Sequence, residues 1–329
     1  MDKLIYPWHK KDWQQLSAYI TQDRIPQALL LAGSEGLAKH ALALRYTQSL
    51  LCTEKTSTEA CLQCESCKLF LAETHPDFMT LQPEEEGKAI RIDDVRALIN
   101  KLSLKPQYLG YRVVLIQPAD KMNMNSANAF LKCLEEPPER TVFLLLTEAM
   151  QALPATILSR CQKMSLSVPD TEDILQWLEE QGINEQAELA LNLAQGSPLL
   201  ALDYAKNNVV QLRSSCFDEW NKVALANACP ISLAEKWHKQ PLGPLLQWLT
   251  LWTEDIVKCT FHVESALLFN KDLAKPLQQL AKRVNRQQLF KFYDLLLKDS
   301  YRINGQLNKQ LLFEELLITW STVAKGKKI

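Results

Sequence analysis

Residues 28–40 have the sequence ALLLAGSEGLAKH, and this segment decides the fold. The apolar run from Ala28 to Ala32 is followed by Gly33, which is typical of a buried parallel strand that enters a turn. Leu42, Leu44 and their neighbours predict a helix over residues 38–52. A strand, a glycine-containing turn and a helix in this order predict an α/β domain.

The same alternation continues to about residue 168. Apolar runs predict further strands at 78–81, 113–116 and 142–146. Between and around them, helices are expected near 13–20, from a cap at Asp93 to Leu102, over 123–135 and from Pro154 to Leu158. This pattern predicts a parallel sheet covered by helices on both faces.

Beyond residue 169 the pattern is helical, and we predict no strand there. Helices are expected at 171–181, 185–195, 198–206, 210–227, 244–262, 273–284, 286–299 and 308–324, with Ser197 and Pro198 opening the third. We predict three domains: residues 1–168, α/β with an insertion at about 52–68; residues 169–207, a small helical domain; and residues 208–329, an all-helical domain.

Composition excludes several classes of protein. The 329 residues carry a formal net charge of −1 and are 47% hydrophobic, which is ordinary for a globular protein. The basic residues Lys325, Lys327 and Lys328 are expected to form a solvated tail, so any contact with DNA is expected to be shared with partners. We find no secretion signal and no apolar stretch that could span a bilayer, and we expect a cytoplasmic protein.

The turn after the first strand resembles a phosphate-binding loop with key residues missing. Such a loop needs a glycine, four residues, and then Gly-Lys-Ser/Thr, whose hydroxyl binds Mg²⁺. Here Gly33, Gly36 and Lys39 are present, but Ala38 stands in place of the second glycine and His40 in place of the hydroxyl. An ordinary strand–turn–helix with one lysine is the alternative.

The residues that follow the predicted strand at 113–116 favour a degenerate phosphate loop over an ordinary strand–turn–helix. In a hydrolysing protein of this class such a strand ends in acidic residues that organise Mg²⁺ and water. Here it is followed by Gln117 and Pro118, neither of which can act as a base. We therefore expect no ATP hydrolysis and no ATP binding at the chain's own loop, although residual binding through Lys39 stays possible.

Two longer motifs give a family resemblance. Residues 128–138, NAFLKCLEEPP, and residues 153–161, LPATILSRC, are similar to two signatures of bacterial clamp loader subunits. Residues 308–312, NKQLL, resemble a third motif. The resemblance implies an AAA+ fold, a helical C-terminal collar domain for oligomerisation, and partners that include ATPase and clamp-opening subunits, a sliding clamp and primed DNA within a DNA polymerase holoenzyme.

The resemblance also implies a role for Arg160. In clamp loaders the arginine of Ser-Arg-Cys, here Ser159, Arg160 and Cys161, acts as a finger in the ATP site of a neighbouring subunit. A plain ion pair after a short helix is the alternative. Active relatives carry a nucleotide-sensing arginine shortly after a Gly-Ser, whereas Gly196 and Ser197 are followed here by Pro198 and Leu199.

Four cysteines lie close together in the sequence, at Cys52, Cys61, Cys64 and Cys67. Four thiolates suit a tetrahedral zinc ion, and a site closed by four protein ligands is structural. An iron–sulfur cluster is the alternative; the resemblance implies zinc. Cysteines 133, 161, 216, 229 and 259 are expected mostly in the core, and His75 is expected to fix a turn.

We therefore expect a clamp loader subunit without its own ATPase activity, which supplies Arg160 in trans. The alternatives are an active clamp loader ATPase, disfavoured by residues 38–40 and 117–118, and a zinc-containing DNA-binding module, disfavoured by the neutral charge.

Overall fold

The computed structural model describes residues 5–55, 57–85, 87–108, 110–184, 186–302 and 308–326. Lys327 and Lys328 of the expected tail lie outside the described residues. The chain divides into two compact units, Met1–Asp203 and Tyr204–Ile329. The small helical group that begins at residue 171 belongs mostly to the first unit, and the three-domain division stays a prediction.

The first unit is built on a five-stranded parallel sheet in the order β2-β3-β4-β1-β5. The strands are β1 (Ala28–Ala32), β2 (Phe78–Leu81), β3 (Arg112–Ile116), β4 (Thr141–Thr147) and β5 (Gln162–Ser165). Four of them match the predicted strands. The fifth was not predicted, because only Met164 among its residues is buried and an edge strand of this kind lacks an apolar run.

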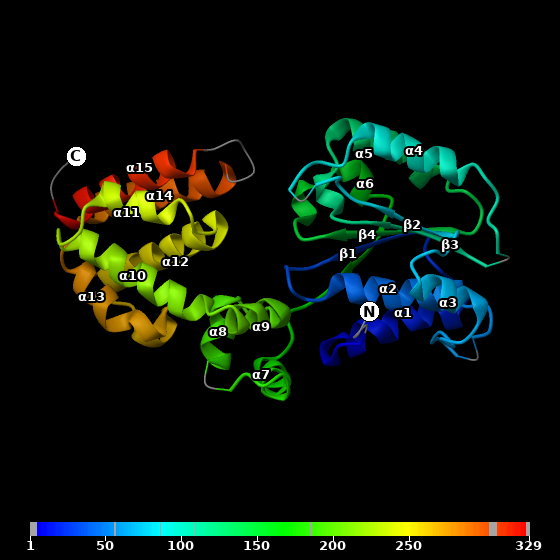
Figure 1. The fold of residues 1–329 in the computed structure, drawn as a ribbon, viewed down its shortest axis with the longest axis horizontal. Coiled ribbons are helices and arrows are strands. Elements are labelled where there is room, and N and C mark those ends of the chain that lie inside the picture. Colours follow the sequence, from blue (N-terminus) through cyan, green and yellow to red (C-terminus); the bar gives the residue numbers. More distant parts are fainter. Residues whose placement is uncertain are drawn as a thin grey trace. The chain divides into compact units, whose positions relative to one another are not determined.

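Helices cover both faces of the sheet (Figure 1). Alternate residues of a strand face opposite sides, so Leu29 and Leu31 of β1 pack with one group of helices and Leu30 with the other. The first group is α1 (Lys10–Thr21), α2 (Lys39–Leu51) and α3 (Glu65–Leu71); the second is α4 (Ile92–Leu102), α5 (Met124–Glu135) and α6 (Ala155–Leu158).

The start of α4 differs from the prediction. Asp93 does not cap this helix, because the helix begins at Ile92, two residues earlier than a cap at Asp93 predicts, and Arg91 occupies the N-cap. Asp94 accepts the Arg91 backbone N–H at 3.0 Å, while Asp93 is exposed and pairs with Arg96. In the structure Asp94 stabilises the start of the helix from its first turn, and neither aspartate is the N-cap.

Three short helices follow the sheet. They are α7 (Thr171–Glu180), α8 (Ala187–Leu193) and α9 (Pro198–Lys206). Ser197, just before α9, donates its hydroxyl to the Glu35 carbonyl, so it joins this helix to the turn after β1.

The second unit is helical throughout its described residues. Its helices are α10 (Val209–Ala224), α11 (Pro230–Trp237), α12 (Leu242–Thr260), α13 (Ala274–Ala281), α14 (Arg286–Arg302) and α15 (Lys309–Ala324). Its core contains five buried tryptophans, and Trp220 and Trp320 stack with ring centroids 4.0 Å apart. No helix in the described parts of the chain is long and apolar enough to cross a bilayer.

Candidate functional site

The turn after β1 is held from the N-terminal side by aromatic residues. The Trp8 indole N–H and the His9 Nε2 both donate to the Leu37 carbonyl, at 3.1 and 2.8 Å. Trp8 also packs edge-to-face on Trp177 of α7, with ring centroids 5.1 Å apart. Burial lowers the pKa of His9, so this side chain is held neutral against the turn.

The same turn is held from the other side by α9. The Gly36 carbonyl accepts the Leu199 backbone N–H at 3.1 Å. Gly36 has a φ of +75°, and a Cβ atom there would lie 2.9 Å from the Leu200 nitrogen and 2.4 Å from the Ser197 hydroxyl. Leu199 therefore stands where the resemblance implies a sensor arginine, and its backbone closes the turn.

Lys39 is turned back onto its own loop. Its ammonium group donates to the Gly33 and Ser34 carbonyls, at 2.9 and 2.8 Å, and lies 3.5 Å from a carboxylate oxygen of Glu148. The residue is only 8% exposed. Burial lowers the pKa of Lys39, and Glu148 acts in the opposite direction. The charge that a working loop offers to phosphate is thus bound by protein oxygens.

The two altered positions of the loop are His40 and Ala38. His40 Nδ1 is hydrogen-bonded to the Gln117 side-chain oxygen, so the residue in place of the magnesium-binding hydroxyl meets the residue in place of an acid. Ala38 has a φ of +59°, a left-handed conformation that glycine adopts without steric cost. The backbone at position 38 has a conformation that favours glycine, although the residue there is alanine.

Two acidic residues at this edge of the sheet were missed by the sequence reasoning. Glu148 follows β4 and faces Lys39, while Asp120 accepts the Thr147 hydroxyl at 2.7 Å. Both follow the carboxyl ends of parallel strands, which meet at one edge of a sheet, and this was the signal that could have found them. Neither residue occupies the position of Gln117 directly after β3, where a hydrolysing protein of this class carries an acidic residue.

The space between Lys39 and Leu199 of α9 is small, although a larger hollow of about 550 Å³ is also lined by His40 and Gln117. A cavity of about 180 Å³ lies between Lys39, His40, Gln117 and Leu199. Pockets for small molecules and cofactors usually measure roughly 300–1,000 Å³. The geometry therefore fits a closed loop better than a nucleotide site.

Arg160 lies on the surface after α6. Its guanidinium donates to the Thr156 carbonyl at 3.0 Å and to the Ser159 hydroxyl at 3.3 Å, and it pairs with Glu135 at 2.7 Å. The ion pair named as the alternative is therefore present. Cys161 is buried beside it, and burial raises the pKa of its thiol to about 11.

Arg160 and the phosphate loop lie at opposite ends of the strands, because Arg160 precedes β5 and the loop follows β1. Gln162 pairs with Leu29, so Arg160 is level with Gln27, before β1 begins, whereas Gly33 follows β1. Six residues of extended chain span roughly 20 Å. Arg160 cannot reach the loop of its own chain, which restricts any role on phosphate to another molecule.

The four cysteines predicted as ligands converge at one point. Their Sγ atoms all lie within 4.8 Å of one another, with Cys52 and Cys64 3.9 Å apart and Cys61 and Cys67 4.0 Å apart. Around one tetrahedral ion with Zn–S bonds of ~2.3 Å, the sulfur atoms would be about 3.8 Å apart. Backbone N–H groups donate to three of the sulfurs at 3.3–3.4 Å. The set fits a single metal ion.

The cysteine cluster is fastened to the sheet domain by buried polar contacts. Ser66, between two of the cysteines, donates to the Leu51 carbonyl at 2.7 Å and contacts His75 Nε2 at 2.9 Å. His75 Nδ1 accepts the Asp77 backbone N–H at 3.1 Å. The expectation that His75 fixes a turn is confirmed, and the same ring also holds the insertion in place.

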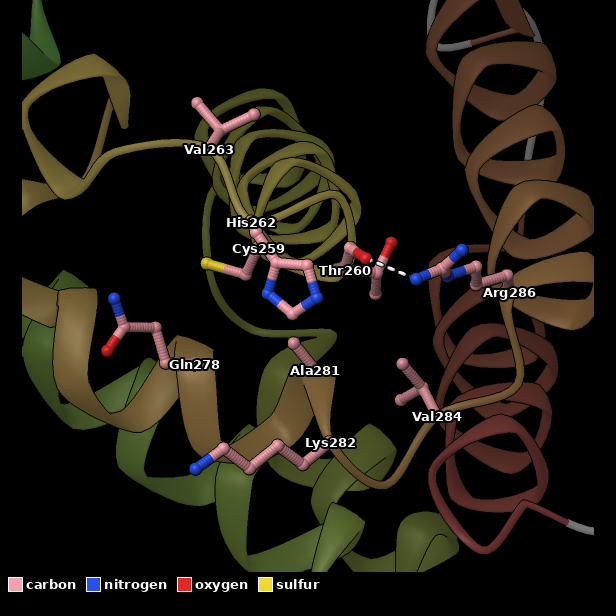
Figure 2. A pocket seen from close by; sticks show the side chains of 9 residues that line it. All are labelled: Cys259, Thr260, His262, Val263, Gln278, Ala281, Lys282, Val284 and Arg286. Carbon is pink, nitrogen blue, oxygen red and sulfur yellow. Dashed lines mark hydrogen bonds between the residues drawn. The ribbon is translucent and has the colours of Figure 1, made fainter.

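A cavity of about 380 Å³ in the second unit is lined by basic residues (Figure 2). Arg286 donates to the Thr260 carbonyl at the end of α12, and Lys282 follows the end of α13. In Figure 2 the Arg286 guanidinium points toward Thr260, and the Lys282 side chain lies below the His262 ring. Cations at helix C-termini are stabilised by the helix dipole, so this charge has a structural cause.

The parallel sheet, the helices on both faces and the phosphate-loop remnant after β1 define an AAA+-type nucleotide-binding domain, here joined to a helical unit. Family models described as "DNA polymerase III, delta subunit" and "DNA polymerase III, delta subunit, C terminal" match residues 8–170 and 182–322. DNA polymerase III subunit delta' of Pseudomonas aeruginosa is 35% identical over 97% of this chain and 98% of its own length. The Escherichia coli subunit is 31% identical over 95% and 94%.

The chain therefore belongs to the DNA polymerase III subunit delta' family. Among solved structures, a gamma subunit-related protein of Thermotoga maritima is 20% identical, covers 94% of this chain and 99% of its own, and has a TM-score of 0.44. The clamp loader delta protein of Bacillus subtilis is 12% identical, covers 94% and 99%, and has a TM-score of 0.34.

The contact between the turn and α9 predicts the effect of Gly36→Ala. The added Cβ meets the Leu200 backbone, and the φ of +75° is costly for alanine, so we expect the free energy of unfolding to fall by about 3 kcal/mol in chemical denaturation. Gly182 has a φ of +84° and nothing within 4 Å of an added Cβ, so Gly182→Ala should cost only about 1 kcal/mol. Equal losses for the two variants would contradict the packing of the turn on α9.

The contacts of Lys39 predict that it stabilises the fold without any nucleotide. Lys39→Met leaves the Gly33 and Ser34 carbonyls without their donor, so the free energy of unfolding should fall by about 2 kcal/mol. Lys163 is exposed on β5, and Lys163→Met should change it by less than about 0.5 kcal/mol. A Lys39→Met variant as stable as the wild type would show that the loop does not need this ammonium group.

Proposed function

We propose that this protein is a subunit of the clamp loader of a replicative DNA polymerase holoenzyme that does not hydrolyse ATP itself. The binding of Lys39 to the carbonyls of its own loop is the observation that carries this proposal. In this role the protein is a rigid cytoplasmic component of a hetero-oligomer with ATPase and clamp-opening subunits. The assembled complex, rather than this chain alone, opens the sliding clamp and places it on primed DNA.

Arg160 is the group that this subunit gives to a neighbour. The guanidinium is permanently charged and its N–H groups match the oxygens of a phosphate. Its position at the sheet edge opposite the loop supports action in trans, because its own loop is out of reach. Ser159 and Cys161 position the turn that presents it. The helical domain at residues 208–329 assembles the collar.

A zinc ion held by Cys52, Cys61, Cys64 and Cys67 stabilises the insertion. When bound, it cross-links residues 52–67 through four thiolates and leaves no position open for catalysis. The close approach of all four sulfur atoms supports one ion, since a multi-iron cluster distributes its thiolates over several metal centres.

Arg160→Ala should lower ATP hydrolysis by the assembled complex without unfolding the subunit. An arginine finger contributes on the order of 10³–10⁵ in rate, so turnover at the one neighbouring site should nearly stop and total DNA-stimulated hydrolysis should fall by that site's share. Lys163→Ala removes a nearby exposed charge and should leave the rate unchanged. Steady-state ATPase assays of reconstituted complexes check this, and full activity of the Arg160→Ala complex would refute the finger.

Metal analysis of the purified chain should find about one zinc ion per molecule. Cys61→Ser should lose the ion and lower the melting temperature, because the insertion loses its cross-link. Cys229 is exposed and lies outside the cluster, so Cys229→Ser should keep the ion. A metal-free wild-type protein, or the visible absorption of an iron–sulfur cluster, would contradict the zinc assignment.

A further inference from the structure

The two signature motifs of the sequence meet at one ion pair. Glu135, in the motif at residues 128–138, ends α5, and Arg160, in the motif at residues 153–161, follows α6. Their charged groups are 2.7 Å apart. Neither motif alone predicts this contact, because 24 residues of chain, which include β4, lie between Glu135 and Arg160.

Among the described residues, Glu135 is the one partner of the Arg160 side chain that comes from another element. The Thr156 carbonyl and the Ser159 hydroxyl belong to the same short turn as Arg160, and Ser159 itself donates to Thr156 at 3.1 Å. These local contacts fix the guanidinium relative to its turn. The contact with Glu135 fixes it relative to α5, and so relative to the sheet domain.

The contacts leave part of the guanidinium free for a phosphate. Nη1 donates to two acceptors, and Nη2 lies 2.7 Å from a carboxylate oxygen of Glu135 in an ion pair. Among the described residues no acceptor is found for the Nε N–H, so this donor remains for a phosphate oxygen. Arg160 also lines a surface hollow of about 200 Å³ with Leu134, Pro137 and Gln162, so this edge of the domain is accessible.

We propose that Glu135 is a positioning residue for Arg160, an inference that rests on the proposed finger. A free arginine side chain has many rotamers, and a finger that must be ordered at the moment of reaction loses much of its effect. The carboxylate orders the guanidinium beforehand and strengthens the contact through its charge. Because the pair is exposed at the surface, it contributes little to folding, and its contribution appears in the rate of ATP hydrolysis.

The experiment uses a reconstituted clamp loader in which only the ATPase subunit next to this chain has an intact phosphate loop. Glu135→Gln should lower its DNA-stimulated kcat about 3- to 10-fold with an unchanged KM for ATP, because the finger acts on the transition state. The melting temperature of the free subunit should stay the same. An unchanged or increased kcat would overturn the proposal, and an increase would mean that Glu135 competes with phosphate for the arginine.

Glu136 provides the matched control. It is the next residue of the same motif, it is exposed, and its side chain has no ion pair or hydrogen bond to the described residues. Glu136→Gln makes the same change of charge one position away and should leave kcat unchanged. An equal loss in the two variants would assign the effect to the charge of the motif and would overturn the positioning role.

A double variant separates this inference from the finger itself. In an Arg160→Ala background, Glu135→Gln should have no further effect on kcat, because Glu135 acts only through Arg160. A further loss in that background would overturn the proposal. If Arg160→Ala alone leaves kcat unchanged, the finger fails; if it lowers kcat while Glu135→Gln does not, only the positioning role fails.

Discussion

The binding of the Lys39 ammonium group by two carbonyl oxygens of its own loop is the interaction on which the rest of the site depends. A lysine in a phosphate loop needs an anion or a set of oxygens, since a buried and unpaired ammonium group is costly. Here the chain supplies the oxygens. The indole of Trp8 and the backbone of Leu199 bind the same turn from two sides, so the loop is closed by contacts that leave little space beside it.

The parallel sheet places the closed loop and Arg160 at opposite ends of its strands. Every strand runs in the same direction, so residues that follow strands gather at one edge and residues that precede them gather at the other. The loop, Gln117 and Glu148 lie at the first edge, and Arg160 lies at the second. One edge is closed on itself and the other presents a charged group to solvent, which is the arrangement expected of a subunit that serves the ATP site of a neighbour.

The sequence predicts the buried parts of this structure well and its polar contacts poorly. The strands Ala28–Ala32 and Phe78–Leu81 have their predicted bounds, because continuous apolar runs are specific to buried strands. The edge strand at Gln162–Ser165 carries no such run and was missed. The sequence marked His40 and Gln117 separately as altered residues, but their hydrogen bond depends on two distant elements. The position of Glu148 after a strand is a signal for the site, but its contact with Lys39 depends on the fold. Glu135 has no local signal, since only the folded chain brings it to Arg160.

Titration of the purified chain with Mg·ATP in a calorimeter tests the central claim most directly. The account predicts no saturable binding up to about 1 mM ATP, because the loop lysine is bound by protein oxygens and the space beside it is small. Saturable binding with a micromolar dissociation constant, followed by release of inorganic phosphate from the isolated chain, would contradict it.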